Sequence, residues 1–248
     1  MTSKKETFST LLKEFEHRYE LRSVFDDFLT IAICSFADIQ SPEGELYTKT
    51  MLKYEDRFRR NFSEMLILLI CEMDKRTDDE DGNDVLGEFF ETEFGEKNIQ
   101  WSVCLFMAKV TRADNDVVLE ESRDNVLRIL DPCCRSGRML HASATIHDRR
   151  HRYYGISIDH TCVKMTALNL FLNNVYDAEV MWADVNDPDD FRISYITSYS
   201  PFGVFQVTEK EKSPFRKICK GVLKTISNSP NLIQKIQREN GGILLVLL

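Results

Sequence analysis

From residue 126 onward, short β-rich runs alternate with runs of helical character, and this alternation restricts the fold more than any other feature. The runs, in order, are VLRILDP (126–132), HASATI (141–146), RYYGISID (152–159), TCVKMTALNLFLNN (161–174) and EVMWADV (179–185). Such a pattern is typical of a parallel sheet covered by helices. Later strands are expected at RISYITSY (192–199) and GILLVLL (242–248), with helices at KSPFRKICKGVLKTI (212–226) and NLIQKIQRE (231–239). The second half of the chain is therefore predicted to be an α/β domain.

The first 95 residues have the apolar periodicity of helices. A first helix is predicted to place four apolar side chains on one face, namely Phe8, Leu11, Leu12 and Phe15. Further helices are expected over 23–37 and from Tyr47 to Met73, separated by a turn at SPEG (41–44). These patterns predict two domains, an all-helical one over 1–95 and an α/β one over 96–248.

The charge balance limits the classes of partner. The chain has 248 residues and a formal net charge of −8, whereas a free-standing DNA-binding protein usually carries a basic surplus. Contact with DNA would therefore need a local patch, and the candidates are DRRHRYY (148–154) and KEKSPFRKICKGVLK (210–224). Each of these also fits an ordinary solvated segment, a loop in the first case and a charged helix face in the second.

The apolar runs and the cysteines point to a location. The longest apolar runs, 28–37 and 65–71, are far shorter than the ~20 residues that span a bilayer, so no membrane association is expected. The seven cysteines are scattered, and no C-x-x-C pair occurs. Because the chain also opens on a polar segment rather than a secretory signal, a cytoplasmic protein is the expectation.

The acidic segment TDDEDGND (77–84) allows two interpretations. Asp79, Asp81 and Glu88 fall at the spacing of calcium-loop ligands, but the first ligand position would be Thr77. The simpler interpretation is a solvated loop in which Asp84 caps the next helix. We therefore predict no metal site.

Four polar stretches follow predicted strands, at the ends where open α/β sheets bind ligands. They are the turn from Asp131 and Pro132 to Ser136 and Gly137, GISID (155–159), WAD (182–184) and SYSPF (198–202). Small residues in the first turn let the backbone approach a ligand, and the amides of the following helix can face it. An acidic group after the second strand can accept hydrogen bonds from ribose hydroxyls.

Taken in order, DPCCRSGRML, YYGISIDHTCVKMTALNLFLNN, the W-A-D and the P-F resemble the N-6 adenine DNA methylase family, the modification subunits of type I-like restriction systems and their mobile-element relatives. The resemblance implies a Rossmann-like class I methyltransferase sheet that binds S-adenosylmethionine, with DNA as partner. Its cofactor-site positions are Asp131, Pro132, Arg135, Ser136, Gly137, Ser157, Asp159 and Asp184. Its target-base loop, N-P-P-F/Y in the family, is Tyr199, Ser200, Pro201 and Phe202, where an aromatic ring stacks an extruded adenine.

Several of these positions depart from the family pattern. Arg135 replaces the first glycine of the cofactor loop, where a guanidinium would repel a sulfonium. The alternative is that its long side chain swings out to solvent. Ser157 replaces the ribose-binding acid, and Asp159 is expected mainly to cap the next helix. Tyr199 replaces the asparagine that receives the target amine. The residues 97–100 replace the family's F-F-T-P, and the last strands and the target-recognition region of the family are expected to be absent.

Three functions stay open on these residues. The first is a DNA adenine methylase relative with impaired or absent methyl transfer, and the second is an active methyltransferase with another substrate. The third is a non-catalytic binding or assembly module. Such a module would use the helical domain or an exposed sheet edge for a protein partner or self-association, since GILLVLL would otherwise leave an apolar edge strand.

Overall fold

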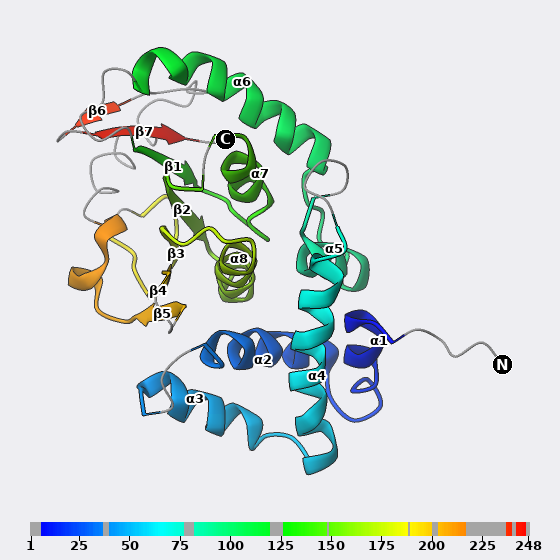
Figure 1. The fold of residues 1–248 in the computed structure, drawn as a ribbon. Coiled ribbons are helices and arrows are strands. Elements are labelled where there is room, and N and C mark those ends of the chain that lie inside the picture. Colours follow the sequence, from blue (N-terminus) through cyan, green and yellow to red (C-terminus); the bar gives the residue numbers. More distant parts are fainter. Residues whose placement is uncertain are drawn as a thin grey trace. The chain divides into compact units, whose positions relative to one another are not determined.

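The computed structural model describes residues 6–36, 40–76, 82–119, 126–147, 149–187, 189–199, 203–216, 237–239 and 242–246 (Figure 1). The chain divides into two compact units, residues 1–97 and residues 98–248. Among the described residues, no helix combines the length and the apolar character that crossing a membrane requires.

The first unit is helical in its described part. Its helices are α1 (Phe8–Lys13), α2 (Leu21–Cys34), α3 (Pro42–Met51), α4 (Asp56–Met73) and α5 (Val85–Phe94). The four expected apolar residues Phe8, Leu11, Leu12 and Phe15 are all buried, but α1 ends at Lys13 and Phe15 lies in the turn that follows it. The two phenylalanine rings contact aromatic side chains of other helices: Phe8 contacts Phe28 and Phe89, and Phe15 contacts Phe58 and Phe62. The core of this unit is therefore built from aromatic pairs.

The single helix expected from Tyr47 to Met73 was wrong, because the chain breaks between α3 and α4. Arg59 fixes the break, since its Nε donates to the carbonyls of Met51 and Tyr54 at 3.0 and 2.8 Å. Tyr54 is held in turn by its hydroxyl, which donates to Asp27 at 2.8 Å. The expected turn at 41–44 was also misplaced, since Pro42 occupies the first turn of α3. Proline is common there because its missing amide is not needed.

The calcium interpretation of the acidic segment depends mostly on residues 77–81, which lie outside the described part of the chain. The capping interpretation is confirmed: the Asp84 carboxylate accepts a hydrogen bond from the Gly87 amide at 2.9 Å at the start of α5. Glu88 instead forms a bidentate ion pair with Arg76 at 2.7 and 2.8 Å. The described residues contain no cluster of three or more acidic, His or Cys side chains that could hold a metal ion.

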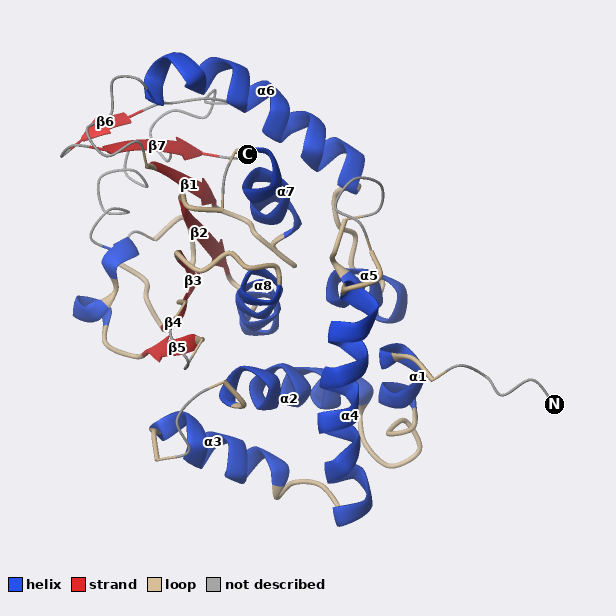
Figure 2. Cartoon of the chain, viewed as in Figure 1, coloured by secondary structure: helices blue, strands red, loops and turns tan. Residues whose placement is uncertain are grey.

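The second unit has a mixed sheet with the strand order β5-β4-β3-β2-β1-β7-β6. The strands are β1 (Leu127–Asp131), β2 (Arg152–Ser157), β3 (Ala178–Trp182), β4 (Ile193–Thr197), β5 (Val204–Val207), β6 (Gln237–Glu239) and β7 (Gly242–Val246). Helices α7 (Arg138–Ile146) and α8 (His160–Leu172) pack on one face of it (Figures 1 and 2). Helix α6 (Trp101–Leu119) packs on α7. The predicted α/β class is confirmed.

The order and direction of the strands correct three expectations. The strands β1, β2, β3 and β7 are parallel, but β4 runs antiparallel to β3, with Thr197 opposite Ala178 and Ile193 opposite Trp182. The strand GILLV is not an edge, since β7 lies between β1 and β6. The helix expected over 231–239 was wrong at its end, because 237–239 form β6. Most of the helix expected over 212–226 lies outside the described residues, and so do residues 231–236 of the helix expected over 231–239.

The other face of the sheet is closed by the segment after β5. A buried cluster there contains Leu130, Tyr154, Ile156, Met181 and Phe215, and the rings of Tyr154 and Phe215 stack at 4.5 Å. The carboxylate of Glu179, which is 2% exposed, ties this segment to the sheet. It accepts hydrogen bonds from Ser194 Oγ, Ser213 Oγ and the Phe215 amide at 2.7, 2.6 and 2.8 Å.

Candidate functional site

The turn between β1 and α7 is built around two left-handed residues. Arg135 has φ 46° and Gly137 has φ 84°. Gly137 suits this conformation, and a Cβ at this position would come within 2.7 Å of Thr166 Cγ2. Arg135 adopts the left-handed conformation despite its Cβ, and its side chain is exposed. The turn therefore follows the path that glycine would favour, with a guanidinium added on its outside.

Helix α8 holds this turn from behind through two side chains. Thr166 Oγ1 donates to the carbonyl of Arg135 at 2.7 Å, and Asn169 Nδ2 donates to the carbonyl of Ser136 at 2.9 Å. Strand β2 holds it from the side, because the Cys134 amide donates to the Ile156 carbonyl at 3.0 Å. Sequence reasoning missed Thr166 and Asn169. Their spacing of three on the helix after the second strand is the signal that points to them.

Asp131 ends β1 and is buried, with 7% of its surface exposed. Its Oδ1 accepts a hydrogen bond from the Cys133 amide at 2.9 Å. Burial raises the pKa of this carboxyl to about 6, although the Cys133 amide and the Arg135 guanidinium both oppose the rise. Pro132, Ser136 and Gly137 are buried as well. Most of the turn is therefore packed, and Cys133 and Arg135 are its exposed members.

The ends of β2 and β3 lie beside this turn, because the three strands are parallel neighbours. Ser157 Oγ accepts a hydrogen bond from the Asp159 amide at 3.1 Å. Asp159 is the N-cap of α8, since its Oδ1 accepts from the Thr161 amide at 2.8 Å. The capping interpretation of Asp159 is therefore confirmed.

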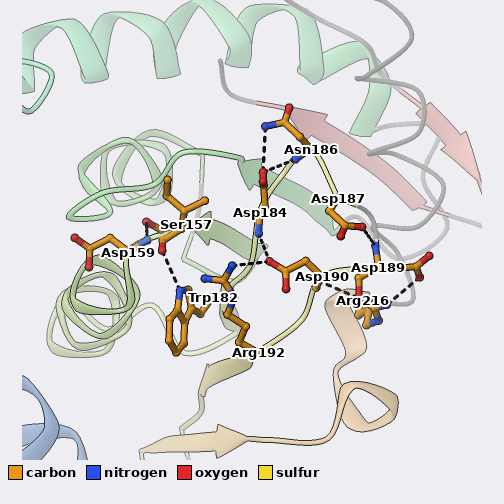
Figure 3. A network of polar contacts seen from close by, with 11 residues as sticks. Ser157, Asp159, Trp182, Asp184, Asn186, Asp187, Asp189, Asp190, Arg192 and Arg216 are labelled. Atoms are coloured by element: carbon orange, nitrogen blue, oxygen red, sulfur yellow. Dashed lines mark hydrogen bonds and ion pairs between the residues drawn. The ribbon is translucent and has the colours of Figure 1, made fainter.

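Asp184, after β3, organises a tight acidic turn. Its Oδ1 accepts from both the backbone and side-chain nitrogens of Asn186, at 2.9 and 3.0 Å (Figure 3). Its own amide donates to Asp190 Oδ2 at 2.7 Å. The 5% exposed Arg216 donates to the carbonyls of Asp189 and Asp190, which fixes the far end of the turn. Asp184 thus has the role of a turn residue at the end of its strand.

Comparison with known protein families shows to which family the chain belongs. The model of the family described as N-6 DNA Methylase matches residues 101–236, more than half of the chain. The chain belongs to the N-6 DNA methylase family. No curated protein and no solved structure matches it.

The match to the N-6 DNA methylase family lies within the second unit and includes the turn after β1, where the resemblance places the cofactor loop. Asp131, Pro132, Arg135, Ser136 and Gly137 form one turn, and Ser157, Asp159 and Asp184 follow the two adjacent strands. These eight residues share the carboxyl edge, meaning the side of the sheet where β1, β2 and β3 end.

Tyr199 does not share that edge, which corrects the expectation that all four polar stretches meet at one side of a parallel sheet. Because β4 is antiparallel, its carboxyl end at Thr197 lies beside the start of β3 at Ala178. The ring of Tyr199 contacts that of Tyr176, which precedes β3, with 5.3 Å between centroids. Ser200, Pro201 and Phe202 lie outside the described residues.

Proposed function

We propose that this member of the N-6 DNA methylase family is a DNA methylase-like protein in which methyl transfer is impaired or absent. The observation that carries the proposal is the separation of two parts that catalysis needs together. The cofactor-loop residues lie at the carboxyl edge of the sheet, whereas Tyr199 lies at the start of the same parallel strands. A methyl donor and a target base held at opposite edges cannot reach an attack geometry, which requires contact distances of about 3 Å.

The residues at the carboxyl edge do not fit the implied cofactor, S-adenosylmethionine, in the way that the family pattern requires. Asp159 caps α8, and the Asp184 carboxylate accepts hydrogen bonds from the backbone and side-chain nitrogens of Asn186. Arg135 adds a cation at the loop where the cofactor's sulfonium would carry the same charge. We therefore expect weak affinity, and we derive no chemical step through the cofactor.

The turn itself still has the form of a ligand loop, which makes the loss of affinity testable at one residue. Arg135 already has a backbone conformation that suits glycine. The substitution Arg135→Gly therefore removes the cation without requiring the loop to move. The control must remove one exposed guanidinium outside the loop. Arg149→Ser does so, whereas Arg138→Gly is unsuitable because Arg138 is the first residue of α7.

The test is calorimetric titration of the full chain with S-adenosylmethionine, together with transfer of labelled methyl groups to DNA. We expect no methyl incorporation by the wild-type chain, and tighter cofactor binding by Arg135→Gly than by Arg149→Ser or wild type. Micromolar binding by the wild-type chain, accompanied by methyl transfer to DNA, would overturn the proposal. Transfer to a nucleic acid other than DNA would instead support the alternative of an active enzyme with another substrate.

A second candidate function, an assembly module, is favoured by the outer face of α6. Val103, Phe106 and Val110 are 42%, 66% and 45% exposed and lie at helical spacing on one side of the helix. Exposed apolar stripes of this kind often mark protein interfaces. Light scattering over a concentration series tests self-association, and Phe106→Ser is the informative variant. A wild-type chain that stays monomeric and a variant with the same behaviour would count against a self-associating module.

By its family, the protein is proposed to belong to a restriction-modification or mobile-element type system, with DNA as its partner and a Rossmann-like methyltransferase sheet as its scaffold. The match over residues 101–236 supports this assignment. The parallel order β3-β2-β1 and the turn after β1 support the scaffold, since ligand loops of such sheets follow the first strand.

A further inference from the structure

The first unit, which the family match does not cover, contains a cleft between two of its segments. One wall is the turn that follows α1, and the other is the first part of α4, a helix that packs on α1 (Figure 1). We call it the α1–α4 cleft. Its volume of about 500 Å³ is within the roughly 300–1,000 Å³ that is usual for small-molecule sites. The lining side chains are Glu14, His17 and Arg18 from the turn, and Arg57, Phe58 and Asn61 from α4.

The two walls are held together by contacts on either side of the cleft. The buried ring of Phe15 contacts the rings of Phe58 and Phe62, with centroids 4.9 and 5.1 Å apart. Asn61 Nδ2 donates to Glu14 Oε2 at 3.2 Å, from one wall to the other. The lining side chains therefore start from fixed backbone positions, and a ligand would meet a cleft that is already formed.

One end of the cleft, the cationic end, is formed by Arg18 and Arg57. Glu55 Oε1 lies 2.9 and 2.8 Å from Nε and Nη2 of Arg18, and its Oε2 lies 3.1 Å from Nε of Arg57. Neither guanidinium has a second ion pair within the described residues, so one carboxylate serves two cations. The Arg57 guanidinium is further restrained by the ring of Phe58, 4.5 Å from its centroid. The exposed imidazole of His17 adds a nitrogen donor next to Arg18.

The other end, the acceptor end, is formed by Glu14 and Asn61. Among the described residues, Glu14 Oε1 and Asn61 Oδ1 accept no hydrogen bond, so both oxygens can accept one from a ligand. Carboxylates at ligand sites accept hydrogen bonds from sugar hydroxyls in this way. Arg57 and Asn61 are four residues apart on α4, which places the two ends about 6 Å from each other along the helix.

The two ends together favour a ligand with two different groups. Paired guanidiniums recognise phosphate and carboxylate oxygens, and a tetrahedral phosphate can accept from several directions at once. The carboxylate of Glu14 would repel a second anionic group but can bind a hydroxyl group. In an α-amino acid the carboxylate and the ammonium share one carbon atom, so they are closer together than the two ends of the cleft.

We propose that the α1–α4 cleft binds a sugar phosphate, a class that includes the nucleoside monophosphates. Arg18, Arg57 and His17 donate to the phosphate, and a sugar hydroxyl donates to Glu14 or Asn61. The proposal does not rest on the proposed function, because the cleft lies in the first unit and uses none of the residues of the cofactor loop.

The test is calorimetric titration of the full chain with ribose 5-phosphate, inorganic phosphate and ribose. We expect ribose 5-phosphate to bind at least about tenfold more tightly than inorganic phosphate, because it reaches both ends of the cleft. Arg57→Gln should weaken its binding about tenfold, the low end for hydrogen bonds to a charged group. Arg18→Gln tests the same end without altering the contact with Phe58. The matched control is Arg60→Gln, an exposed position on α4 outside the lining, which should keep wild-type affinity.

The acceptor end is tested by Glu14→Gln, with Glu16→Gln as control because Glu16 is exposed in the same turn and does not line the cleft. Glu14→Gln should weaken ribose 5-phosphate about fivefold, since the hydroxyl loses a charged acceptor. It should not weaken inorganic phosphate, which does not reach this end. A general charge effect would have the opposite sign, because removing a carboxylate raises the affinity for any anion.

Several results would overturn the site. They are no binding of ribose 5-phosphate, equal losses in Arg57→Gln and Arg60→Gln, or equal affinities for ribose 5-phosphate and inorganic phosphate. Tighter binding of L-glutamate than of ribose 5-phosphate would overturn the choice of a phosphate. Adenosine 5′-monophosphate serves as a further probe: tighter binding than ribose 5-phosphate, lost in Arg57→Gln, would support the site with a nucleotide as its ligand. None of these results would affect the proposed function, because each is read from variants of the first unit.

Discussion

Replacement of Asp131 by asparagine should stabilise the second unit at neutral pH. Asp131 is buried at the end of β1, and burial raises its pKa from the ordinary value of 3.8 to about 6. Its Oδ1 accepts from the Cys133 amide, and an asparagine oxygen can accept the same hydrogen bond. The substitution therefore removes the buried charge and keeps the contact.

The sign and size follow from the binding of protons. Because the pKa of Asp131 is higher in the folded state, folding favours the protonated acid, and its contribution to stability is complete below pH 3.8. The contribution falls as the pH rises from 3.8 to about 6 and is constant above that range. A difference of about two pKa units corresponds to about 3 kcal/mol. We expect Asp131→Asn to gain up to about 3 kcal/mol at pH 7 and little at pH 4.

The measurement is urea unfolding followed by tryptophan fluorescence at several pH values. Both tryptophans of the chain, Trp101 and Trp182, lie in the second unit, so the signal reports on that unit alone. Asp177→Asn is the control, since this carboxylate is 62% exposed and its ion pair should contribute at most about 1 kcal/mol. The reasoning is refuted if the difference between Asp131→Asn and wild type is the same at pH 4 and pH 7.

Three further predictions use the same unfolding assay. Arg135→Gly should stabilise the second unit by about 0.5–1 kcal/mol, because it relieves a left-handed arginine while adding the chain entropy of glycine; a loss of stability would contradict this. Glu179→Gln should destabilise it by about 2–3 kcal/mol, because three donors lose a charged acceptor, whereas the exposed Glu211→Gln should have little effect. Gly137→Ala should cost about 2 kcal/mol or more, since φ is 84° and the new methyl group would meet Thr166 Cγ2 at 2.7 Å. Part of that cost should return in the double variant with Thr166→Ser, and a purely additive result would show that the contact is not the cause.

Local signals in the sequence were sufficient for much of the second unit. The strand–turn–helix from Leu127 to Ile146 was predictable because an apolar run, a proline and a glycine mark its parts. The cap at Asp159 was predictable because a helical run follows it directly. In the first unit, the buried face of α1 followed from periodicity alone.

Features set by distant contacts were not predictable from one sequence. The direction of β4 depends on which strand it joins, and its apolar pattern fits either direction. The break between α3 and α4 depends on Arg59 and on the contact between Tyr54 and Asp27, while the apolar stripe continues through it. Thr166 and Asn169 are ordinary helix residues until the turn that they bind is placed beside them.

The direction of one strand therefore changes the functional interpretation of the chain. With β4 parallel to its neighbours, Tyr199 would follow a strand at the carboxyl edge, and its loss of the family's asparagine would be a damaged step in a catalytic site. With β4 antiparallel, Tyr199 lies on the side of the sheet where β1, β2 and β3 begin, and its exposed ring belongs to a different surface. The two edges carry different chemistry: a packed turn around the buried Asp131 at one edge, and the exposed ring of Tyr199 at the other. Substitution of Tyr199 should consequently leave ligand binding at the turn after β1 unchanged, because distant sites without shared partners act independently.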